Sequence, residues 1–337
     1  MNAILVVRYS ALGDVVLATS VLGPLRARFP RARIEWVTSS PYAALLEGSP
    51  ELAAVHRLDR GGLGGAIALG RALRGRFDVA VDLQNKLKSR LVARAAAPRV
   101  IVFRRRTPGR ALLALLGADP PMRGPHATDL YAGALRPLGV GGAGRPRIHP
   151  SAAARGRAAS ALAAAGRPRV AVAPGASTAT KRWPAERFAE VARALADGGA
   201  SVVLAGGPSD RVEIDAFRAA LGRPVAADLT DLPVDALAAG LAEVDLLLAC
   251  DSGPVHLAAA VGTPVVAIFG PTSPERWGPP APGRAVALPI ACAPCSNHGG
   301  ARCPRGHHRC MLDLGAATVI EAARDAMARS PRSPNPE

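Results

Sequence analysis

The segment RVAVAPGASTATKRWPAERFAEVARALA, residues 169–196, decides the fold of this chain. Its first five residues form a short apolar run, which is typical of a buried strand. Small and polar residues follow, and from Pro184 onward the apolar positions recur at helical spacing. We therefore predict a strand at 169–173, a loop, and a helix at 184–196, which is the unit of a parallel sheet.

The same unit recurs along the chain. A strand at 3–8 precedes a helix at 15–29, which Pro30 ends. Further strands are predicted at 34–38, 78–83, 202–205, 244–249 and 264–269, with a further helix at 255–261. This alternation predicts an α/β protein with two doubly wound parallel sheets and with ligands at the carboxyl ends of the strands, between the two halves.

The length of 337 residues also suits two domains. A glycine-rich stretch at 141–144 and an alanine-rich predicted helix at 152–166 mark the boundary. We predict domains at 1–150 and 151–329. The Pro/Ser-rich end, residues 330–337, is predicted to be a disordered tail.

The formal net charge of +16 is distributed unevenly, with +17 on residues 1–168 and −1 on residues 169–337. Such an excess indicates an anionic partner, which could be nucleic acid, an acidic membrane surface or a phosphorylated substrate. Aromatic residues make up only 4% of the chain, too few for a platform on which bases stack. The composition therefore argues against a nucleic-acid binder.

The chain shows no export signal and no run of 18 apolar residues, the nearest being 255–269. We therefore predict a cytoplasmic protein that contacts a membrane only peripherally.

The motif YSALGDVV, residues 9–16, lies between the first strand and its helix. Gly13 permits a tight turn, and Asp14 lies at or next to the helix start. Asp14 either caps this helix or acts as a general base that takes a proton from a hydroxyl nucleophile.

Two further motifs follow strands of the second half. In PGASTATKRWP, residues 174–184, backbone N–H groups can hold phosphate and Lys181 adds a positive charge, although a plain loop would look similar.

In CDSGPVH, residues 250–256, the N–H groups of Ser252 and Gly253 can bind an anion at a helix N-terminus. Asp251 can accept a hydrogen bond from a sugar hydroxyl or cap the helix. His256 either faces the same anion or is a buried, hydrogen-bonded residue.

Four of the five cysteines fall within 19 residues: Cys292, Cys295, Cys303 and Cys310. They predict either a zinc site, since zinc takes four thiolates tetrahedrally, or free or redox-paired thiols. Cys250, the fifth, is predicted to be a packed thiol.

Taken together and in this order, the motifs at 10–14, 174–184, 251–257 and 270–272 resemble glycosyltransferase family 9, the bacterial ADP-heptose:lipopolysaccharide heptosyltransferases. The resemblance covers roughly Ile4 to Arg324. It implies a GT-B fold of two Rossmann-like domains that face each other across a cleft. The N-terminal domain receives the acceptor, and the C-terminal domain holds the sugar nucleotide.

The resemblance also implies an inverting transfer of heptose from ADP-heptose to inner-core lipopolysaccharide, on the cytoplasmic face of the inner membrane. Asp14 matches the base. The implied donor-binding residues are Gly175, Ala176, Ser177, Lys181, Asp251, Ser252, Gly253, Pro254 and His256. The family's acidic ribose contact matches either Asp210 or Glu213. Helix N-termini and Lys181 can neutralise the leaving diphosphate, so the chemistry needs no metal in principle.

The positive half of the chain is the half that the resemblance assigns to the acceptor. We predict that Gly13, Lys86, Lys88 and Arg90 bind the acceptor. A second basic cluster comprises Arg104, Arg105, Arg106 and Arg110. Both clusters are expected to meet acceptor phosphates and carboxylates or anionic lipid headgroups.

Two rival interpretations stay open at this point. One is a GT-B transferase with another donor, or an epimerase of similar fold. The other is a basic nucleic-acid-binding protein with a zinc knuckle. The chain is predicted to act as a monomer.

Overall fold

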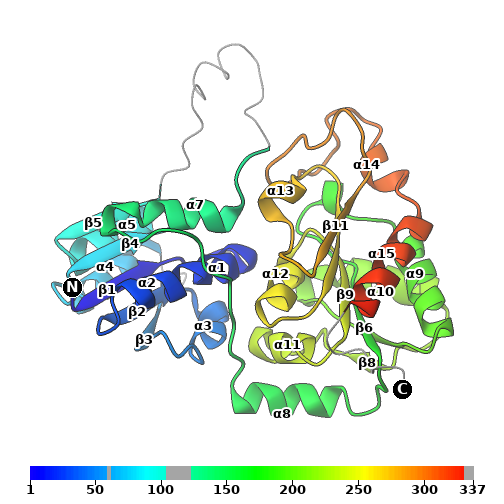
Figure 1. Ribbon diagram of the computed structural model, residues 1–337, viewed down its shortest axis with the longest axis horizontal. Coiled ribbons are helices and arrows are strands. Elements are labelled where there is room, and N and C mark those ends of the chain that lie inside the picture. Colours follow the sequence, from blue (N-terminus) through cyan, green and yellow to red (C-terminus); the bar gives the residue numbers. More distant parts are fainter. Residues whose placement is uncertain (59–61, 104–122, 330–337) are drawn as a thin grey trace. The chain divides into compact units, whose positions relative to one another are not determined.

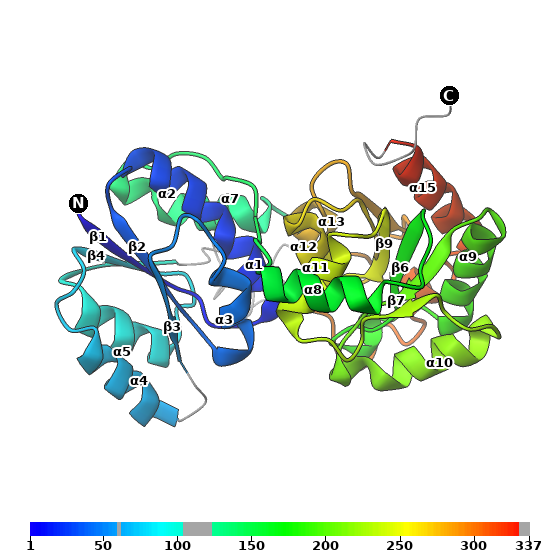
Figure 2. The same ribbon diagram turned by 90° about the horizontal axis from the view of Figure 1, so that it is seen from below.

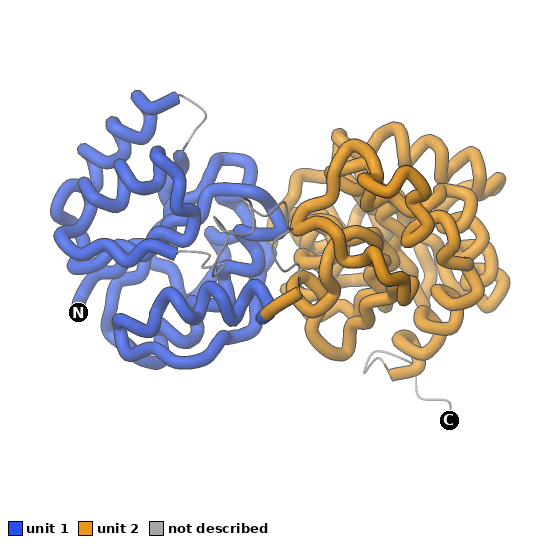
Figure 3. Tube along the Cα trace, turned by 90° about the horizontal axis from the view of Figure 1, so that it is seen from above, with its two compact units in different colours: residues 1–109, 125–151 blue, residues 110–124, 152–337 orange. Residues whose placement is uncertain are grey.

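The computed structural model describes residues 1–58, 62–103 and 123–329. These residues divide into two compact units (Figure 3). Among the described residues, unit 1 contains 1–58, 62–103 and 125–151, and unit 2 contains 123–124 and 152–329. The predicted tail at 330–337 and the predicted cluster of Arg104, Arg105, Arg106 and Arg110 lie outside the described residues.

Unit 1 is built on a five-stranded parallel sheet with the strand order β3-β2-β1-β4-β5. The strands are β1 (Ala3–Val7), β2 (Arg33–Thr38), β3 (Ala54–Arg57), β4 (Val79–Asp82) and β5 (Arg99–Val102). All five residues of β1 are buried, because helices cover both faces of a parallel sheet. In the register of the sheet, Val7 lies opposite Val37 on one side and Asp82 on the other. The loops that follow β1 and β4 are therefore neighbours.

Helices cover this sheet as Figure 1 shows. They are α1 (Leu12–Ala18), α2 (Leu22–Arg28), α3 (Ser40–Leu46), α4 (Gly62–Ala72), α5 (Leu87–Ala96) and α7 (Ala127–Ala134), with short 3₁₀ turns at Thr19–Val21 and Arg136–Leu138.

The single helix predicted at 15–29 is wrong, because the chain forms α1, a 3₁₀ turn and α2 in its place. Pro24 has no N–H group, so it cannot donate to the Ser20 carbonyl four residues earlier. The N–H of Gly144 donates to that carbonyl instead, at 3.0 Å. The glycine-rich stretch predicted as a flexible boundary is therefore fastened to unit 1 at its last residue.

Unit 2 is built on a six-stranded parallel sheet with the strand order β11-β10-β9-β6-β7-β8. The strands are β6 (Arg169–Ala173), β7 (Ser201–Leu204), β8 (Ala227–Asp228), β9 (Leu246–Cys250), β10 (Val265–Phe269) and β11 (Arg284–Ala287). Ala173 pairs with Ala249, and Ile268 pairs with Cys250. The three loops after β6, β9 and β10 therefore begin at the same edge.

The helices of unit 2 are α8 (Ala152–Ala161), α9 (Ala185–Asp197), α10 (Arg211–Leu221), α11 (Val234–Leu241), α12 (Gly253–Ala260), α13 (Pro274–Trp277), α14 (Arg309–Leu312) and α15 (Ala316–Ala328), with 3₁₀ turns at Ala179–Lys181 and Pro208–Asp210. Helices α9, α10 and α15 bury apolar stripes against the sheet in one large core, which contains Phe188, Phe217 and Val319.

The α/β class with two parallel sheets is confirmed, and strand β6 coincides with the predicted range 169–173. None of the helices in the described ranges has both the length and the apolar character that a membrane span requires.

We expect Gly144→Ala to destabilise unit 1, because the added Cβ would lie 2.7 Å from the Ser20 carbonyl oxygen and 2.9 Å from Pro24 Cδ. The expected loss in the free energy of unfolding is about 1–3 kcal/mol, measured by urea denaturation. Gly141→Ala is the matched control, since its Cβ would meet nothing within 4 Å. Equal stability of the two variants would contradict the role of Gly144.

Candidate active site

The carboxylate of Asp14 is held by two side chains of unit 1. Asp14 lies in the first turn of α1, whose N-cap residue Ala11 makes no side-chain capping bond. Arg8 forms an ion pair with Asp14 at 2.6 Å from Nη2 to Oδ2, and the hydroxyl of Tyr131 donates to Oδ1 at 2.8 Å. Both carboxylate oxygens are therefore engaged, and about a quarter of the side chain is exposed to solvent.

Arg8 is itself fixed from two further directions. Its Nη1 donates to the carbonyl of Leu83 at 2.7 Å, and its guanidinium lies 5.5 Å from the centroid of the Tyr131 ring. Tyr131 in turn packs edge-on against Phe103. Neither Arg8 nor Tyr131 was predicted from the sequence as a site residue. Arg8 could have been found from the sequence, because it is a charged residue at the end of an apolar predicted strand. A charge buried at such a position requires a partner.

The loop after β4 is joined to the loop that carries Asp14. Gln84 Oε1 accepts from the N–H groups of Tyr9 and Ser10, both at 3.2 Å. Asp82 Oδ1 accepts from the N–H groups of Gln84 and Asn85 at 3.0 and 2.8 Å. Burial raises the pKa of Asp82, although these hydrogen bonds oppose the shift. Asp82 thus holds the backbone of Gln84 in place, and the Gln84 side chain holds the loop at Tyr9 and Ser10, which carries Asp14.

The predicted acceptor-binding residues lie at these two loops. Gly13 is the second residue of α1, and exposed Lys86 is the N-cap residue of α5. The Arg90 N–H donates to the Lys86 carbonyl at 2.9 Å, so one helical turn separates the two residues. The guanidinium of Arg90 donates to Asn85 Oδ1, and Lys88 is half-buried.

In unit 2, three polar side chains converge where β6, β9 and β10 end. Lys181 Nζ lies 3.3 Å from Asp251 Oδ2, and the Thr272 hydroxyl donates to the same oxygen at 2.7 Å. All three residues are buried. Lys181 and Asp251 were predicted as separate donor contacts, and the structure brings them together. Thr272 was part of the motif at 270–272, but no role was predicted for its side chain.

The helix that follows Asp251 leaves its N-terminus without a side-chain cap. The Ser252 hydroxyl donates back to the Cys250 carbonyl at 3.0 Å, so it does not close α12. Gly253 and Pro254 are the first residues of α12, and His256 is buried within it. An uncapped helix N-terminus favours a bound anion.

Gly175 lies directly against Asp210. A Cβ on Gly175 would come within 2.3–2.5 Å of the Asp210 side chain, so only glycine fits here. Asp210 Oδ2 also accepts from the Gly207 N–H at 3.0 Å. Glu213, the other acidic candidate, is paired with Arg182 at 2.7 Å.

The two residues after Gly175 differ in exposure. Ala176 is buried in the core of unit 2, whereas Ser177 is exposed. Of the pair, only Ser177 offers a side chain to a ligand.

The cysteine-rich segment, residues 292–310, forms hydrogen bonds with the loop that carries Lys181. Gly300 accepts from both the N–H and the hydroxyl of Thr180, and its own N–H donates to that hydroxyl at 2.7 Å. His308 Nε2 lies 2.8 Å from the Thr180 carbonyl oxygen. The N–H of Cys295 donates to Pro271 at 2.9 Å, which ties the segment to the Thr272 loop as well.

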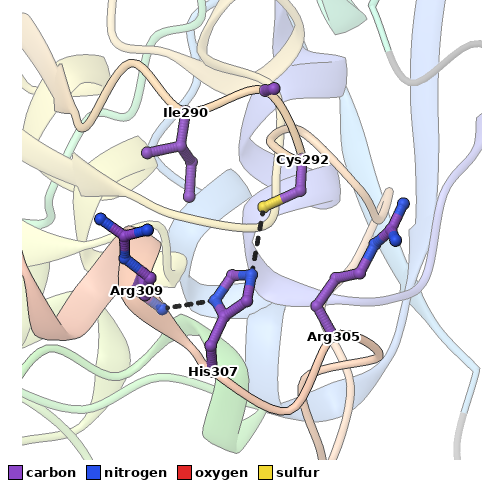
Figure 4. Close-up of a pocket in the computed structure, with 6 residues that line it drawn as sticks. Ile290, Cys292, Arg305, His307 and Arg309 are labelled. Atoms are coloured by element: carbon purple, nitrogen blue, oxygen red, sulfur yellow. Dashed lines mark hydrogen bonds between the residues drawn. The ribbon is translucent and has the colours of Figure 1, made fainter.

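The side chains of the four clustered cysteines line two pockets. Cys292 lines a pocket of about 470 Å³ with Arg305, His307 and Arg309 (Figure 4). The His307 Nδ1 accepts from the Arg309 N–H, which leaves Nε2 facing the Cys292 sulfur at 3.8 Å.

The other three clustered cysteines, Cys295, Cys303 and Cys310, line a second pocket of about 240 Å³. Across the described ranges, no three Cys, His, Asp or Glu side chains converge to hold a metal ion. The four cysteines therefore do not present the ligand set that the predicted zinc site requires.

Cys250 is a packed thiol, as predicted. It is buried at the end of β9 and accepts from the Trp183 N–H at 3.4 Å. Burial raises its pKa to about 12. Such a thiol stays protonated and unreactive at neutral pH.

Comparisons with known proteins point to one family. Residues 66–301 match the family model described as glycosyltransferase family 9 (heptosyltransferase). The chain is 30% identical to lipopolysaccharide heptosyltransferase 1 of Pseudomonas aeruginosa, over 92% of this chain and 91% of that protein. It is 28% identical to lipooligosaccharide heptosyltransferase 2 of Haemophilus influenzae, over 97% and 99%.

A solved structure agrees with these relatives. The structure of Escherichia coli ADP-heptose LPS heptosyltransferase II matches 98% of this chain and 99% of its own, with 26% identity and a TM-score of 0.77.

We expect Thr272→Val to weaken ADP binding about tenfold, because Asp251 loses a hydrogen bond that helps to position Lys181. Isothermal titration calorimetry with ADP measures the change. Thr263→Val is the matched control, since its buried hydroxyl donates to the Leu241 carbonyl away from Asp251. The same ADP affinity in both variants would contradict the role of Thr272.

Proposed function

The chain belongs to glycosyltransferase family 9, the heptosyltransferases, and from this premise we propose that it transfers heptose from ADP-heptose to the inner core of lipopolysaccharide, with inversion. The main observation in support is that one sheet edge presents a base and the other presents groups that can hold a diphosphate. Unit 1 offers a positioned carboxylate at Asp14, and unit 2 offers a cation, Lys181, beside an uncapped helix N-terminus.

Asp14 acts as the base in this reaction. It takes the proton from the acceptor hydroxyl as that oxygen attacks the anomeric carbon, and the bond from this carbon to the diphosphate breaks on the opposite face. Arg8 and Tyr131 are positioning residues, because they hold the two carboxylate oxygens in a fixed orientation. A fixed base avoids reorganisation during the reaction.

The leaving ADP is stabilised by groups of unit 2. Lys181 and the N–H groups of Ser252 and Gly253 neutralise the diphosphate charge that grows in the transition state. Asp251 and Thr272 position Lys181. The chemistry proposed here is carried by these groups and needs no metal ion.

Asp210 is our assignment for the acidic contact to the ribose. It lies against the Gly175 loop, whereas the carboxylate of Glu213 is taken by Arg182. The donor-binding set is completed by Ala176, Ser177, Pro254 and His256.

We assign the acceptor's anionic groups to Lys86, Lys88 and Arg90, next to Gly13, at the carboxyl edge of the unit 1 sheet. Because the proposed acceptor is a lipid, we place the enzyme at the inner face of the inner membrane. We also propose that it acts as a monomer. Lys86→Gln with Lys88→Gln should raise the acceptor KM about tenfold, because two charge contacts are lost, and leave the donor KM unchanged. Steady-state kinetics with truncated lipopolysaccharides measures this, and an unchanged acceptor KM would contradict the assignment.

Product analysis tests the reaction itself. The protein is incubated with ADP-heptose and a series of truncated lipopolysaccharides, in parallel with UDP- and GDP-sugars, and products are detected by mass. We expect one added heptose with the ADP donor alone. Transfer from only a UDP- or GDP-sugar would contradict the proposed donor.

Asp14→Asn should lower kcat at least a hundredfold and leave ADP affinity unchanged, because the amide cannot accept the acceptor's proton. Steady-state kinetics and calorimetry measure the two effects. Near-normal turnover would remove Asp14 from the role of base.

Tyr131→Phe gives a graded test of the same carboxylate. Losing one orienting hydrogen bond should lower kcat about tenfold, with the donor KM unchanged. Tyr42→Phe is the matched control, since Tyr42 is a partly exposed residue of α3. Equal kcat values for the two variants would contradict a positioning role for Tyr131.

A further inference from the structure

Exposed apolar side chains of unit 1 gather on two neighbouring helices. Six large apolar residues of the described chain are exposed, and three of them, Leu63, Ile67 and Leu87, belong to α4 and α5. Leu87 is 61% exposed, and Leu63 and Ile67 are 46% and 42% exposed. Isolated exposed leucines are ordinary in soluble proteins, but three on one pair of helices call for an explanation.

One exposed stripe of α4 carries apolar residues at its start and arginines at its end. Leu63, Ile67, Arg71 and Arg74 follow one another at intervals of four, four and three residues, so they share one side of the helix and the turn after it. All four are exposed. No ion pair involves Arg71 or Arg74 in the part of the chain that the structure describes.

Helix α5 lies beside α4 (Figure 2). The two helices approach closely at Gly70, where a Cβ would lie 3.1 Å from Ala95 Cβ. On α5, Leu87, Arg90 and Arg94 are exposed at intervals of three and four residues.

The segment that contains α4 and α5 is strongly basic. Residues 62–98 contain seven basic residues and two acidic ones, Asp78 and Asp82. Asp82 is buried, and Asp78 accepts hydrogen bonds from the N–H groups of Asn2 and Ala3. The exposed surface therefore combines apolar side chains with guanidinium groups and carries little negative charge.

We propose that the outer face of α4 and α5, formed by Leu63, Ile67, Arg71, Arg74, Leu87 and Arg94, docks on an anionic lipid bilayer. Leucine and isoleucine side chains enter the headgroup region while arginines pair with lipid phosphates. Both helices begin where β3 and β4 end, on the same sheet edge as Asp14. Docking there would keep the acceptor-binding edge close to the membrane. The inference rests on the proposed function in one respect, namely that the acceptor is carried by that bilayer.

Vesicle co-sedimentation of the full-length protein tests the proposal. Phosphatidylcholine vesicles are compared with vesicles in which about a third of the lipid is phosphatidylglycerol. We expect binding to the anionic vesicles that weakens with added salt. Equal binding to both compositions would overturn the proposal, since the arginines would then play no part.

Two variants of this face separate its apolar and charged parts. Arg71→Gln, Arg74→Gln and Arg94→Gln together should weaken vesicle binding about a hundredfold, at about fivefold for each charge. Leu63→Ser with Ile67→Ser should weaken it about tenfold. The matched control removes three exposed arginines elsewhere, Arg31→Gln, Arg145→Gln and Arg155→Gln. If that control weakens binding as much as the first variant, net charge alone explains the effect and the proposed face is wrong.

Transfer assays distinguish failure of this proposal from failure of the proposed function. With a deacylated, water-soluble acceptor, the face variants should keep wild-type turnover. With the acylated acceptor in vesicles, they should lose at least tenfold. No transfer by the wild type to either acceptor would contradict the proposed function, whereas equal loss on both acceptors would overturn membrane docking. A wild-type dimer that Leu63→Ser with Ile67→Ser dissociates would also overturn it, in favour of a second copy on this face.

Discussion

Parallel pairing of the central strands is the constraint on which both units depend. Because parallel strands all point the same way, their carboxyl ends and the loops that follow meet at one edge. In unit 1, this pairing sets Val7 beside Asp82, so the Asp14 loop and the Gln84 loop become neighbours. In unit 2, it sets the ends of β6, β9 and β10 side by side, which brings Lys181, Asp251 and Thr272 together.

Each of these two sheet edges carries an ion pair with at least one buried partner, and the two pairs differ in how far they are exposed to solvent. Asp14 is paired with a buried arginine that is itself bonded to a backbone carbonyl, so the carboxylate is fixed but remains partly exposed. Lys181 and Asp251 form a buried pair, which gains little stability because desolvating both charges offsets their attraction. The pair does hold the Lys181 ammonium group in a fixed position, which the proposed binding of a diphosphate requires.

The cysteine-rich segment acquires a clear structural role from its backbone. Its hydrogen bonds reach Thr180 in one loop and Pro271 in another. These two loops carry Lys181 and Thr272, the side chains that contact Asp251. The clustering of four cysteines left zinc binding and free or redox-paired thiols as alternatives, whereas in the structure backbone groups of this segment make most of the contacts to the neighbouring loops. Those contacts could not be predicted, because backbone hydrogen bonding between distant loops leaves no pattern of side chains.

The sequence by itself determined the α/β class, most strands, and the positions of Asp14, Lys181 and Asp251 after strand ends, because apolar runs and helical spacing are local properties. It did not determine the 3₁₀ turn at Thr19–Val21. There the Ser20 carbonyl accepts a hydrogen bond from Gly144, because Pro24 cannot donate one and Gly144 is 120 residues further along the chain than Pro24. Only the tertiary structure placed Arg8 and Tyr131 on Asp14 and paired Lys181 with Asp251. It also gave Asp210 and Glu213 different neighbours, Gly175 and Arg182. The physical reason is that these are contacts between side chains far apart in the sequence, and their partners are chosen by strand order and register.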